Sequence, residues 1–128
     1  MANISIDQLA NAITEAVREY TEDVSAAIEK KVDEVADQVL RETKNLAPKR
    51  TGEYAKTFVK TKQDEYGRIR RVIWNRKHYR RVHLLEFGHA KRGGGRVSAY
   101  PHLRPAYEKY ALQLPDEIKR IIKKGGGE

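Results

Sequence analysis

The sequence predicts an α+β fold in a single domain of 128 residues: a long N-terminal helix, a small antiparallel sheet with a short helix, and a C-terminal helix. Apolar residues recur every three or four positions over the first third of the chain. Alternating residues and turn residues follow in the middle, and helical spacing returns at the end. The expected segments are about 5–47 for the long helix, 54–100 for the sheet and basic loop, 102–124 for the C-terminal helix and 125–128 for a disordered tail.

The long helix is predicted from its apolar spacing between Ser5 and Leu46. Ser5 and Gln8 have the spacing of a capping box, and Pro48 would end the helix. A helix of about 40 residues is roughly 60 Å long, whereas a compact domain of this length has a radius of gyration of about 14 Å. The helix therefore either bends or breaks around residues 21–25, or packs its outer half on a neighbouring subunit, which we favour. The candidate subunit-packing residues are Leu9, Ile13, Val17, Tyr20 and Val24.

The middle of the chain is predicted to hold a hairpin and a short helix. Tyr54–Lys62 is rich in β-formers and is expected to be a strand, followed by a turn at residues 64–67 and a returning strand over Arg68–Trp74. The candidates for the packed side of the returning strand are Ile69, Val72 and Trp74. Tyr79–Phe87 has the spacing of a short helix, with a strand as the alternative because period does not separate the two in so short a run. Val97–Tyr100 is expected to be a short strand.

The last segment, Pro101–Lys124, has helical spacing of its apolar residues. Pro115 lies inside it and predicts a kink or a break, because proline removes a hydrogen bond from the helix. Three glycines and Glu128 follow and are expected to be disordered.

Charge is distributed unevenly along the chain, whose formal net charge is +8. Residues 1–48 carry 5 basic and 10 acidic side chains, residues 49–104 carry 16 and 4, and residues 105–128 carry 5 and 4. An acidic first third thus precedes a strongly basic middle. Such asymmetry indicates either contact with nucleic acid or docking of the acidic part of one subunit on the basic part of another.

Other features exclude several classes of protein. The chain has no cysteine, which removes disulfides, thiolate metal sites and cysteine nucleophiles. No apolar stretch approaches the roughly 20 residues of a membrane span, and the N-terminus lacks the pattern of a signal peptide. We expect a soluble cytosolic protein with no membrane partner and no cofactor.

Histidines and one glutamate are the candidates for chemistry. The spacing of His78, His83 and His89 does not place them on one helical face, so we expect these residues and His102 to be surface or loop histidines and no metal to bind. Glu86 is the one acid in an apolar run, and it is either paired with an arginine or perturbed for catalysis. We favour the structural ion pair, because several arginines lie close in the sequence, at positions 68, 70, 71, 80, 81, 96 and 104. No second carboxylate or serine triad accompanies Glu86. No catalytic residue is expected.

The basic middle also supports two alternative functions. Aromatic residues lie among its lysines and arginines, and cations with aromatics are typical of nucleic-acid surfaces. These aromatic residues are Tyr54, Tyr66, Trp74, Tyr79 and Tyr100. A nucleic-acid-binding module would depend on Arg70, Arg71, Arg80 and Arg81. A small basic ribonuclease using His83 or His89 is the less favoured alternative.

A basic, glycine-rich loop over residues 90–96 lies between two ordered segments. Its glycines leave the backbone unrestrained, and Lys91, Arg92 and Arg96 keep it from collapsing onto the core. Loops of this kind commonly make contacts with partners.

Three blocks of sequence resemble the neck and tail-completion proteins of long-tailed bacteriophages. The first is the long helix ending in Ala47-Pro48 with Thr51-Gly52, the second is Tyr79 with Leu84 to Gly88, and the third is Tyr100-Pro101 with Leu103 to Ala106. The chain departs from the pattern at two positions. His89 stands where a small hydroxyl residue is common, and His102 where an aromatic residue is usual.

The resemblance implies a virion structural protein of α+β fold at the head-tail junction. Subunits would form a ring, a hexamer or a dodecamer, around the channel through which genome DNA passes. The partners would be head-connector or head-closure proteins and tail-terminator proteins, and assembly would take place in the cytoplasm of the bacterial host. The interaction candidates are Glu86, Phe87, Gly88, Lys91, Arg92, Arg96, Tyr100, Pro101, Arg104 and Pro105.

Overall fold

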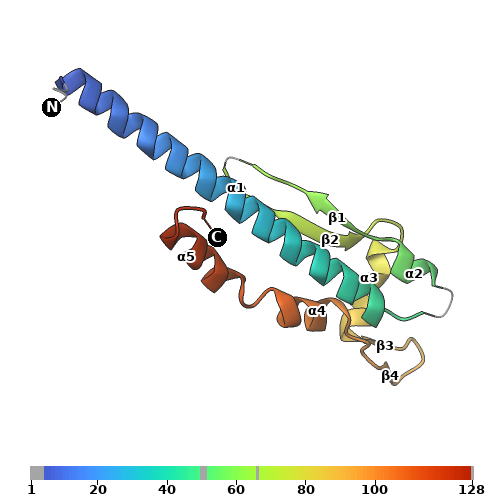
Figure 1. Cartoon of the computed structure of the whole chain (residues 1–128). Helices are drawn as coiled ribbons and strands as arrows, with labels where there is room; N and C mark the ends of the chain where they lie inside the picture. The colour runs from blue at the N-terminus through green and yellow to red at the C-terminus, as the bar shows by residue number, and fades with distance from the viewer. Residues whose placement is uncertain (1–4, 50–51, 66, 128) are drawn as a thin grey trace. The chain divides into compact units, whose positions relative to one another are not determined.

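The computed structural model describes residues 5–49, 52–65 and 67–127, and Figure 1 shows the order of its helices and strands. The chain divides into two compact units: one is Val32–Leu114, and the other joins Met1–Lys31 to Pro115–Glu128. The α+β class is confirmed, while the assignment of the whole chain to one domain stays a prediction. Three residues named above lie outside the described part of the chain: Thr51, Tyr66 and Glu128.

Helix α1 (Ile6–Leu46) is continuous, so the alternative of a break around residues 21–25 is wrong. It begins with the predicted capping box, in which the N–H of Gln8 donates to Ser5 Oγ at 3.2 Å and the N–H of Ser5 donates to Gln8 Oε1 at 3.0 Å. The buried residues of the helix all lie in its C-terminal half: Val35, Ala36, Val39 and Thr43. The N-terminal half therefore contributes no fully buried side chain.

The unit Val32–Leu114 has two small apolar clusters. The first contains Val35, Val39, Ala106 and Ala111. The second contains Ala47, Ala55 and the fully buried Phe58. Ile73 packs against both clusters, so one side chain links α1 to the sheet and to the C-terminal part of this unit.

The hairpin is formed by strands β1 (Phe58–Lys62) and β2 (Arg71–Asn75), which pair antiparallel from Phe58 with Asn75 to Lys62 with Arg71. The predicted turn is confirmed by the backbone bridge between Glu65 and Arg68. The strand prediction is wrong at its start, because Glu53–Lys56 forms the short helix α2.

Polar side chains explain why α2 replaces the start of the predicted strand. Asn75 Nδ2 donates to the carbonyl of Tyr54 at 2.7 Å, and the hydroxyl of Thr57 bonds back to the carbonyl of Glu53 at 3.1 Å. The same hydroxyl lies 2.9 Å from Asn75 Oδ1, so its single proton is shared between these acceptors. Side-chain bonds to nearby carbonyls compete with strand pairing, and here they favour a helical turn.

The packed side of β2 also differs from the prediction. Ile73 faces the core together with the fully buried Asn75 and with Arg71, whose side chain is 3 % exposed. Trp74, predicted to pack, is exposed and donates from Nε1 to the hydroxyl of Thr61 at 2.7 Å. Since side chains alternate along a strand, burying Ile73 requires Arg71 and Asn75 to turn inward as well. The prediction chose Ile69, Val72 and Trp74 for the packed side because these residues are more apolar. It therefore assigned the wrong face of β2 to the core.

Helix α3 (Tyr79–Phe87) is confirmed in place and type, and its strand alternative is wrong. Strands β3 (His89–Ala90) and β4 (Arg96–Val97) then pair across the basic loop, so the predicted strand over Val97–Tyr100 is displaced and shorter.

The predicted C-terminal helix is two helices, α4 (Leu103–Tyr110) and α5 (Leu114–Lys123). The break precedes Pro115, which lies in the first turn of α5, where a missing N–H costs little. No helix in the described part of the chain is long and apolar enough to cross a membrane.

The end of the chain is capped rather than disordered over Gly125–Gly127. The N–H of Gly126 donates to the carbonyl of Ile121 at 3.0 Å and that of Gly125 to Ile122 at 3.2 Å, the two bonds of a Schellman motif. Gly125 has φ +64°, and a Cβ on Gly126 would lie 2.6 Å from the carbonyl oxygen of Asp23 in α1. The capped turn therefore packs on α1 within the unit that contains both segments.

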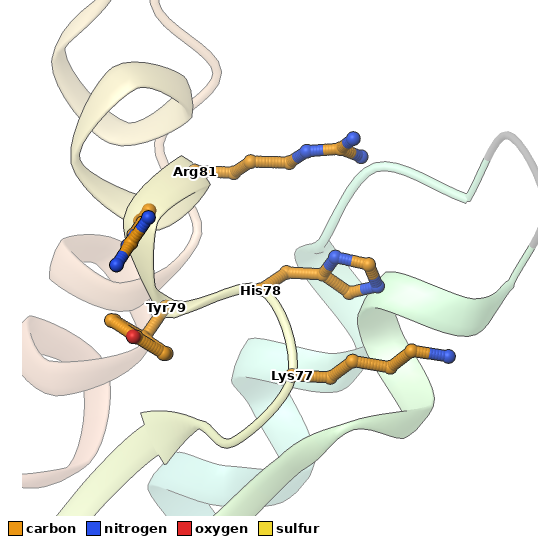
Figure 2. A pocket seen from close by; sticks show the side chains of 5 residues that line it. Lys77, His78, Tyr79 and Arg81 are labelled. Carbon is orange, nitrogen blue, oxygen red and sulfur yellow. The ribbon is translucent and has the colours of Figure 1, made fainter.

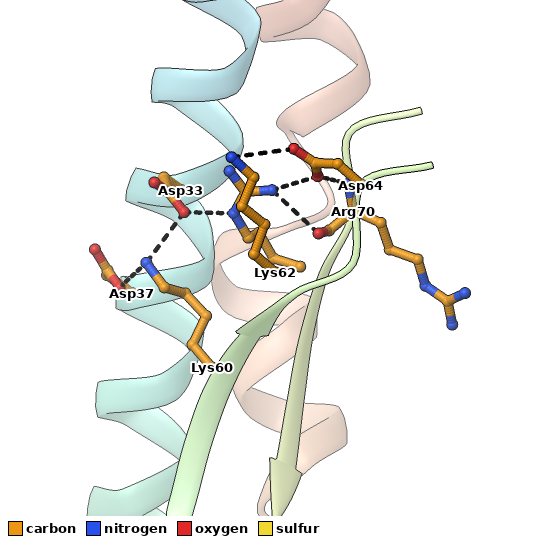
Figure 3. A network of polar contacts seen from close by, with 7 residues as sticks. Asp33, Asp37, Lys60, Lys62, Asp64 and Arg70 are labelled. Carbon is orange, nitrogen blue, oxygen red and sulfur yellow. Dashed lines mark hydrogen bonds and ion pairs between the residues drawn. The ribbon is translucent and has the colours of Figure 1, made fainter. Parts of the chain in front are cut away.

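A network of charges joins α1 to the hairpin inside the unit Val32–Leu114, and Figure 3 shows it. Arg71 Nε lies 2.6 Å from Asp33 Oδ1, and its Nη1 lies 2.6 Å from Asp64 Oδ1. Lys60 Nζ lies 2.7 Å from Asp37 Oδ1 and 3.1 Å from Asp33 Oδ1. The hydrogen bonds from Arg71 and Lys60 hold the pKa of Asp33 below its ordinary value. Part of the acidic helix thus pairs with the basic middle in the same chain.

We predict that Arg71→Met lowers the free energy of unfolding by about 1 to 3 kcal/mol, because two carboxylates lose the buried guanidinium they share. The neighbouring Arg70→Met is the matched control. Its side chain points away from the network in Figure 3, and its replacement should cost less than about 0.5 kcal/mol. Urea unfolding of the two variants measures both values, and equal losses would contradict the role given to Arg71.

Candidate functional site

The second and third sequence blocks meet at a joint between α3 and α4. The N–H of Tyr100 donates to the carbonyl of Leu85. The Glu86 carboxylate accepts three backbone N–H groups, with Oε1 3.0 Å from the nitrogens of His102 and Leu103 and Oε2 3.0 Å from that of Arg104. Since the first N–H groups of a helix lack partners within the helix, Glu86 caps α4 from another element.

This geometry corrects the prediction of an ion pair between Glu86 and an arginine. The residue is 7 % exposed, and its partners are backbone amides at a helix N-terminus. Arg104 contributes only its N–H to Glu86, while its side chain pairs with Glu108 at 3.0 Å. Burial raises the pKa of Glu86, but the three backbone hydrogen bonds together outweigh it and lower the pKa. Glu86 is therefore a charged structural group at neutral pH and is poorly suited to donate a proton.

His102 is fully buried in the joint, so the prediction that it is a surface or loop histidine is wrong. Its Nδ1 lies 2.8 Å from the carbonyl oxygen of Tyr100 and 3.1 Å from Glu86 Oε1. Both atoms are acceptors, so Nδ1 carries a proton, and in the neutral ring Nε2 accepts from the Tyr54 hydroxyl at 2.6 Å. Burial, and then the charge of Glu86, raise the pKa of Tyr54.

The imidazole of His102 also occupies the position of an aromatic ring. Its centroid lies 5.4 Å from that of Tyr54 and 5.6 Å from that of Phe58, both with edge-on geometry. His102 can therefore fill the place where an aromatic residue was expected from the resemblance, while adding two hydrogen bonds.

Gly88 ends α3 where the returning chain crosses it. A Cβ at this position would lie 2.6 Å from the carbonyl oxygen of Val97 and 3.0 Å from the nitrogen of Ala99. Its φ of +74° also disfavours any side chain. Close approach and backbone conformation therefore both require glycine at this point.

The ten interaction candidates divide into buried and accessible groups. Glu86 and Gly88 are buried and Pro105 is half-buried. The exposed candidates are Phe87, Lys91, Arg92, Arg96, Tyr100, Pro101 and Arg104. Arg96 Nη2 donates to the carbonyl of Phe87 at 3.0 Å and so fixes the base of the basic loop at the end of α3.

The outer face of α3 is exposed, basic and aromatic. Arg80, Leu84 and Phe87 are spaced by four and three residues and so share a face of the helix. Tyr79 is exposed beside the guanidinium of Arg80. We define the α3 surface by six residues: Lys77, Tyr79, Arg80, Arg81, Leu84 and Phe87.

An open hollow lies at the start of α3. It has a volume of about 300 Å³ and is lined by Lys77, His78, Tyr79, Arg80 and Arg81 (Figure 2). Figure 2 shows the Lys77, His78 and Arg81 side chains extending to one side of the chain at this point. Arg80 and Arg81 are among the predicted nucleic-acid contacts, but the sequence does not predict this concavity, because it depends on the bend of the chain between β2 and α3.

Residues 6–24 of α1, which we call the arm, carry the candidate packing residues. Leu9 is 51 %, Ile13 56 % and Val17 59 % exposed. Tyr20 and Val24 are covered further by their own chain, since the Tyr20 hydroxyl donates to the carbonyl of Ile122 at 2.8 Å and Val24 is half-buried. The arm has five acidic side chains and one basic side chain. It is therefore an acidic helix with an apolar stripe.

The described residues contain no group of three or more histidines, aspartates or glutamates arranged to hold a metal ion. Glu86 is the one carboxylate close to His83 and His89 in the sequence. Its oxygens accept hydrogen bonds from backbone amides and so are already used. Arg71 is equally committed to its ion pairs, so it is withdrawn from the set of arginines expected to contact nucleic acid.

A family model described as "Bacteriophage HK97-gp10, putative tail-component" matches residues 11–88. The match covers most of α1, the hairpin and α3. No curated protein and no solved structure matches the chain.

We predict that Glu86→Gln lowers the free energy of unfolding at pH 7 by about 1 to 3 kcal/mol, because an amide oxygen replaces a charged acceptor at the start of α4. The folded-state pKa of Glu86 is lowered, so its contribution is full above the ordinary value of 4.5 and is lost as the pH falls through the folded value. The difference between wild type and variant should therefore shrink below about pH 4. Urea unfolding at several pH values tests this, and a difference independent of pH would contradict the charged cap.

Proposed function

The chain belongs to the HK97-gp10-like family of bacteriophage tail components, and from this premise we propose that it is a structural protein that forms a ring at the head-tail junction of the virion. In this role it joins the head-connector or head-closure proteins to the tail-terminator protein. Genome DNA passes through the ring without sequence-specific contact. Subunits are made and assembled in the host cytoplasm and remain in the virion.

The observation that carries the proposal is the exposed apolar stripe of the arm. Leu9, Ile13 and Val17 are each more than half exposed in the single chain. Burying a whole aliphatic side chain is worth about 1.5 to 3 kcal/mol, so a stripe of three favours association. A continuous helix presents all three on one side, which suits a subunit interface better than scattered surface residues would.

We predict that the full chain forms a closed oligomer whose mass is a fixed multiple of 14.7 kDa. Replacing Leu9, Ile13 and Val17 with glutamine should weaken association by at least about 100-fold, because little apolar surface remains to be buried. Native mass spectrometry, and light scattering after size-exclusion chromatography, measure the mass of the oligomer and the loss of association. Glutamine at Asn11, Ser25 and Ala26, three exposed positions outside the stripe, is the matched control and should assemble normally.

The placement in the virion needs a separate experiment. Antibodies against the chain, visualised with gold on purified particles, should mark the neck between head and tail. Labelling only along the tail tube or at its tip would contradict the proposed position without affecting the family assignment. A wild-type chain that remains monomeric at high concentration, alone and with connector proteins, would contradict the ring.

The exposed cations support a second candidate function, binding of nucleic acid. We predict that replacing Arg70, Arg80 and Arg81 with serine reduces affinity for DNA and flattens its dependence on salt, if the basic middle binds the phosphate backbone. Lys119→Ser, Arg120→Ser and Lys123→Ser together remove three exposed cations from α5 and are the matched control. Filter binding at several salt concentrations measures the effect, and unchanged binding in the variant lacking Arg70, Arg80 and Arg81 would remove this candidate.

A further inference from the structure

Leu9, Ile13 and Val17 lie N-terminal to the part of the arm that the capped C-terminal turn covers, and each is more than half exposed. The charges nearer the C-terminus of α1 are already used, because Asp33 and Asp37 pair with Arg71 and Lys60, and Glu42 pairs with Lys109. Lys60 and Arg71 of the hairpin are therefore engaged within one chain. Whatever covers Leu9, Ile13 and Val17 must offer apolar surface together with positive charge located elsewhere.

The α3 surface has both properties. Tyr79, Leu84 and Phe87 are exposed apolar or aromatic side chains. Arg80 and Arg81 add exposed positive charge, whereas Lys77 is paired with Glu53 in its own chain. Arg80 makes no ion pair with a carboxylate among the described residues, and its guanidinium lies 5.7 Å from the centroid of the Tyr79 ring. The hollow beside it gives the surface a concave part.

Charge decides between two ways of covering the arm. Two arms packed on each other would bring together helices with a net charge of −4 each, counted from Asp7, Glu15, Glu19, Glu22 and Asp23 against Arg18. The repulsion between two such negatively charged helices in contact opposes their association. An arm packed on an α3 surface brings opposite charges together and buries apolar groups on both sides.

We propose that the arm of one copy docks on the α3 surface of a second copy. This inference rests on the proposed ring, and it names the two faces that make its subunit interface. The two faces differ, so the interface is heterologous, and each copy both gives an arm and receives one. Repetition of such a contact produces a ring when the rotation between copies closes.

Mixing two defective chains tests the proposal. The arm variant carries glutamine at Leu9, Ile13 and Val17, and the surface variant carries Arg80→Glu, Arg81→Glu and Leu84→Gln. We expect each to be monomeric alone in native mass spectrometry. Mixed in equal amounts they should form a heterodimer and nothing larger, because one intact arm and one intact α3 surface remain between them. Circular dichroism and thermal melting confirm that both variants are folded.

Three outcomes would overturn the proposal, two from the mixing experiment and one from filter binding of the surface variant to DNA. A surface variant that assembles like wild type shows that the arm is received elsewhere. A mixture that stays monomeric shows that the two faces are not complementary. A surface variant that assembles normally but loses affinity for DNA assigns the α3 surface to nucleic acid. In the first and third cases the ring itself remains, whereas a monomeric wild-type chain would contradict the proposed function as a whole.

A second measurement applies even if a triple variant fails to fold. The chain has no cysteine, so single substitutions give unambiguous cross-links. We expect an Ile13→Cys chain mixed with a Leu84→Cys chain to form a disulfide-linked dimer under mild oxidation. An Asn11→Cys chain is the control and should give at least about tenfold less cross-linked product with Leu84→Cys. A dimer that forms just as fast from the Ile13→Cys chain alone would show that arms pair with each other and would overturn the proposal.

Discussion

The hydrogen bonds from the start of α4 to the Glu86 carboxylate are the constraint on which the arrangement around the basic loop depends. They tie together two segments that lie sixteen to eighteen residues apart in the sequence. With both ends of the intervening chain held, residues 88–101 must return to the place where they left α3. Gly88 permits the close crossing, and Arg96 holds the loop base to the carbonyl of Phe87. The exposed faces of α3 and of the loop are therefore presented by a joint built from buried polar groups.

Charge serves two purposes in this chain. Within the unit Val32–Leu114, acidic residues of α1 and basic residues of the hairpin neutralise each other at close distance, with Arg71 almost completely shielded from solvent. On the arm and on α3, by contrast, charges of opposite sign remain exposed. Pairing inside the unit orients the hairpin on the helix, while the exposed charges are available for association and for its salt dependence. The uneven charge distribution along the sequence thus includes charges paired within the chain and charges that remain exposed.

Local signals in the sequence were sufficient for several elements. The capping box at Ser5 and Gln8, the uninterrupted apolar spacing of α1 and the spacing of Tyr79–Phe87 each depend on neighbouring residues, and all three are confirmed. The hairpin turn is confirmed for the same reason.

The failures share a different cause, namely polar side chains whose partners are distant in the sequence. Asn75 stabilises α2 across 21 residues, and Arg71 turns inward because Asp33 meets it across 38 residues. His102 is buried because Tyr54, 48 residues away, satisfies its ring. A pattern of apolar residues contains no information about these bonds. Glu86 was correctly identified as unusual, but the chemistry of its partner was wrong, since backbone amides leave no signature in the sequence.

The crossing at Gly88 also bears on how such a protein can diversify. Any other residue there would push against the Val97 and Ala99 backbone, so the root of the loop has almost no mutational freedom. At its tip the opposite holds: a methyl group added at Gly93 meets no atom within 4 Å. Substitutions are therefore tolerated mainly at the tip of the loop, where they change the exposed side chains without altering the backbone at Gly88. A lineage adapting to an altered neighbour could thus exchange the part that touches it and leave the supporting scaffold intact.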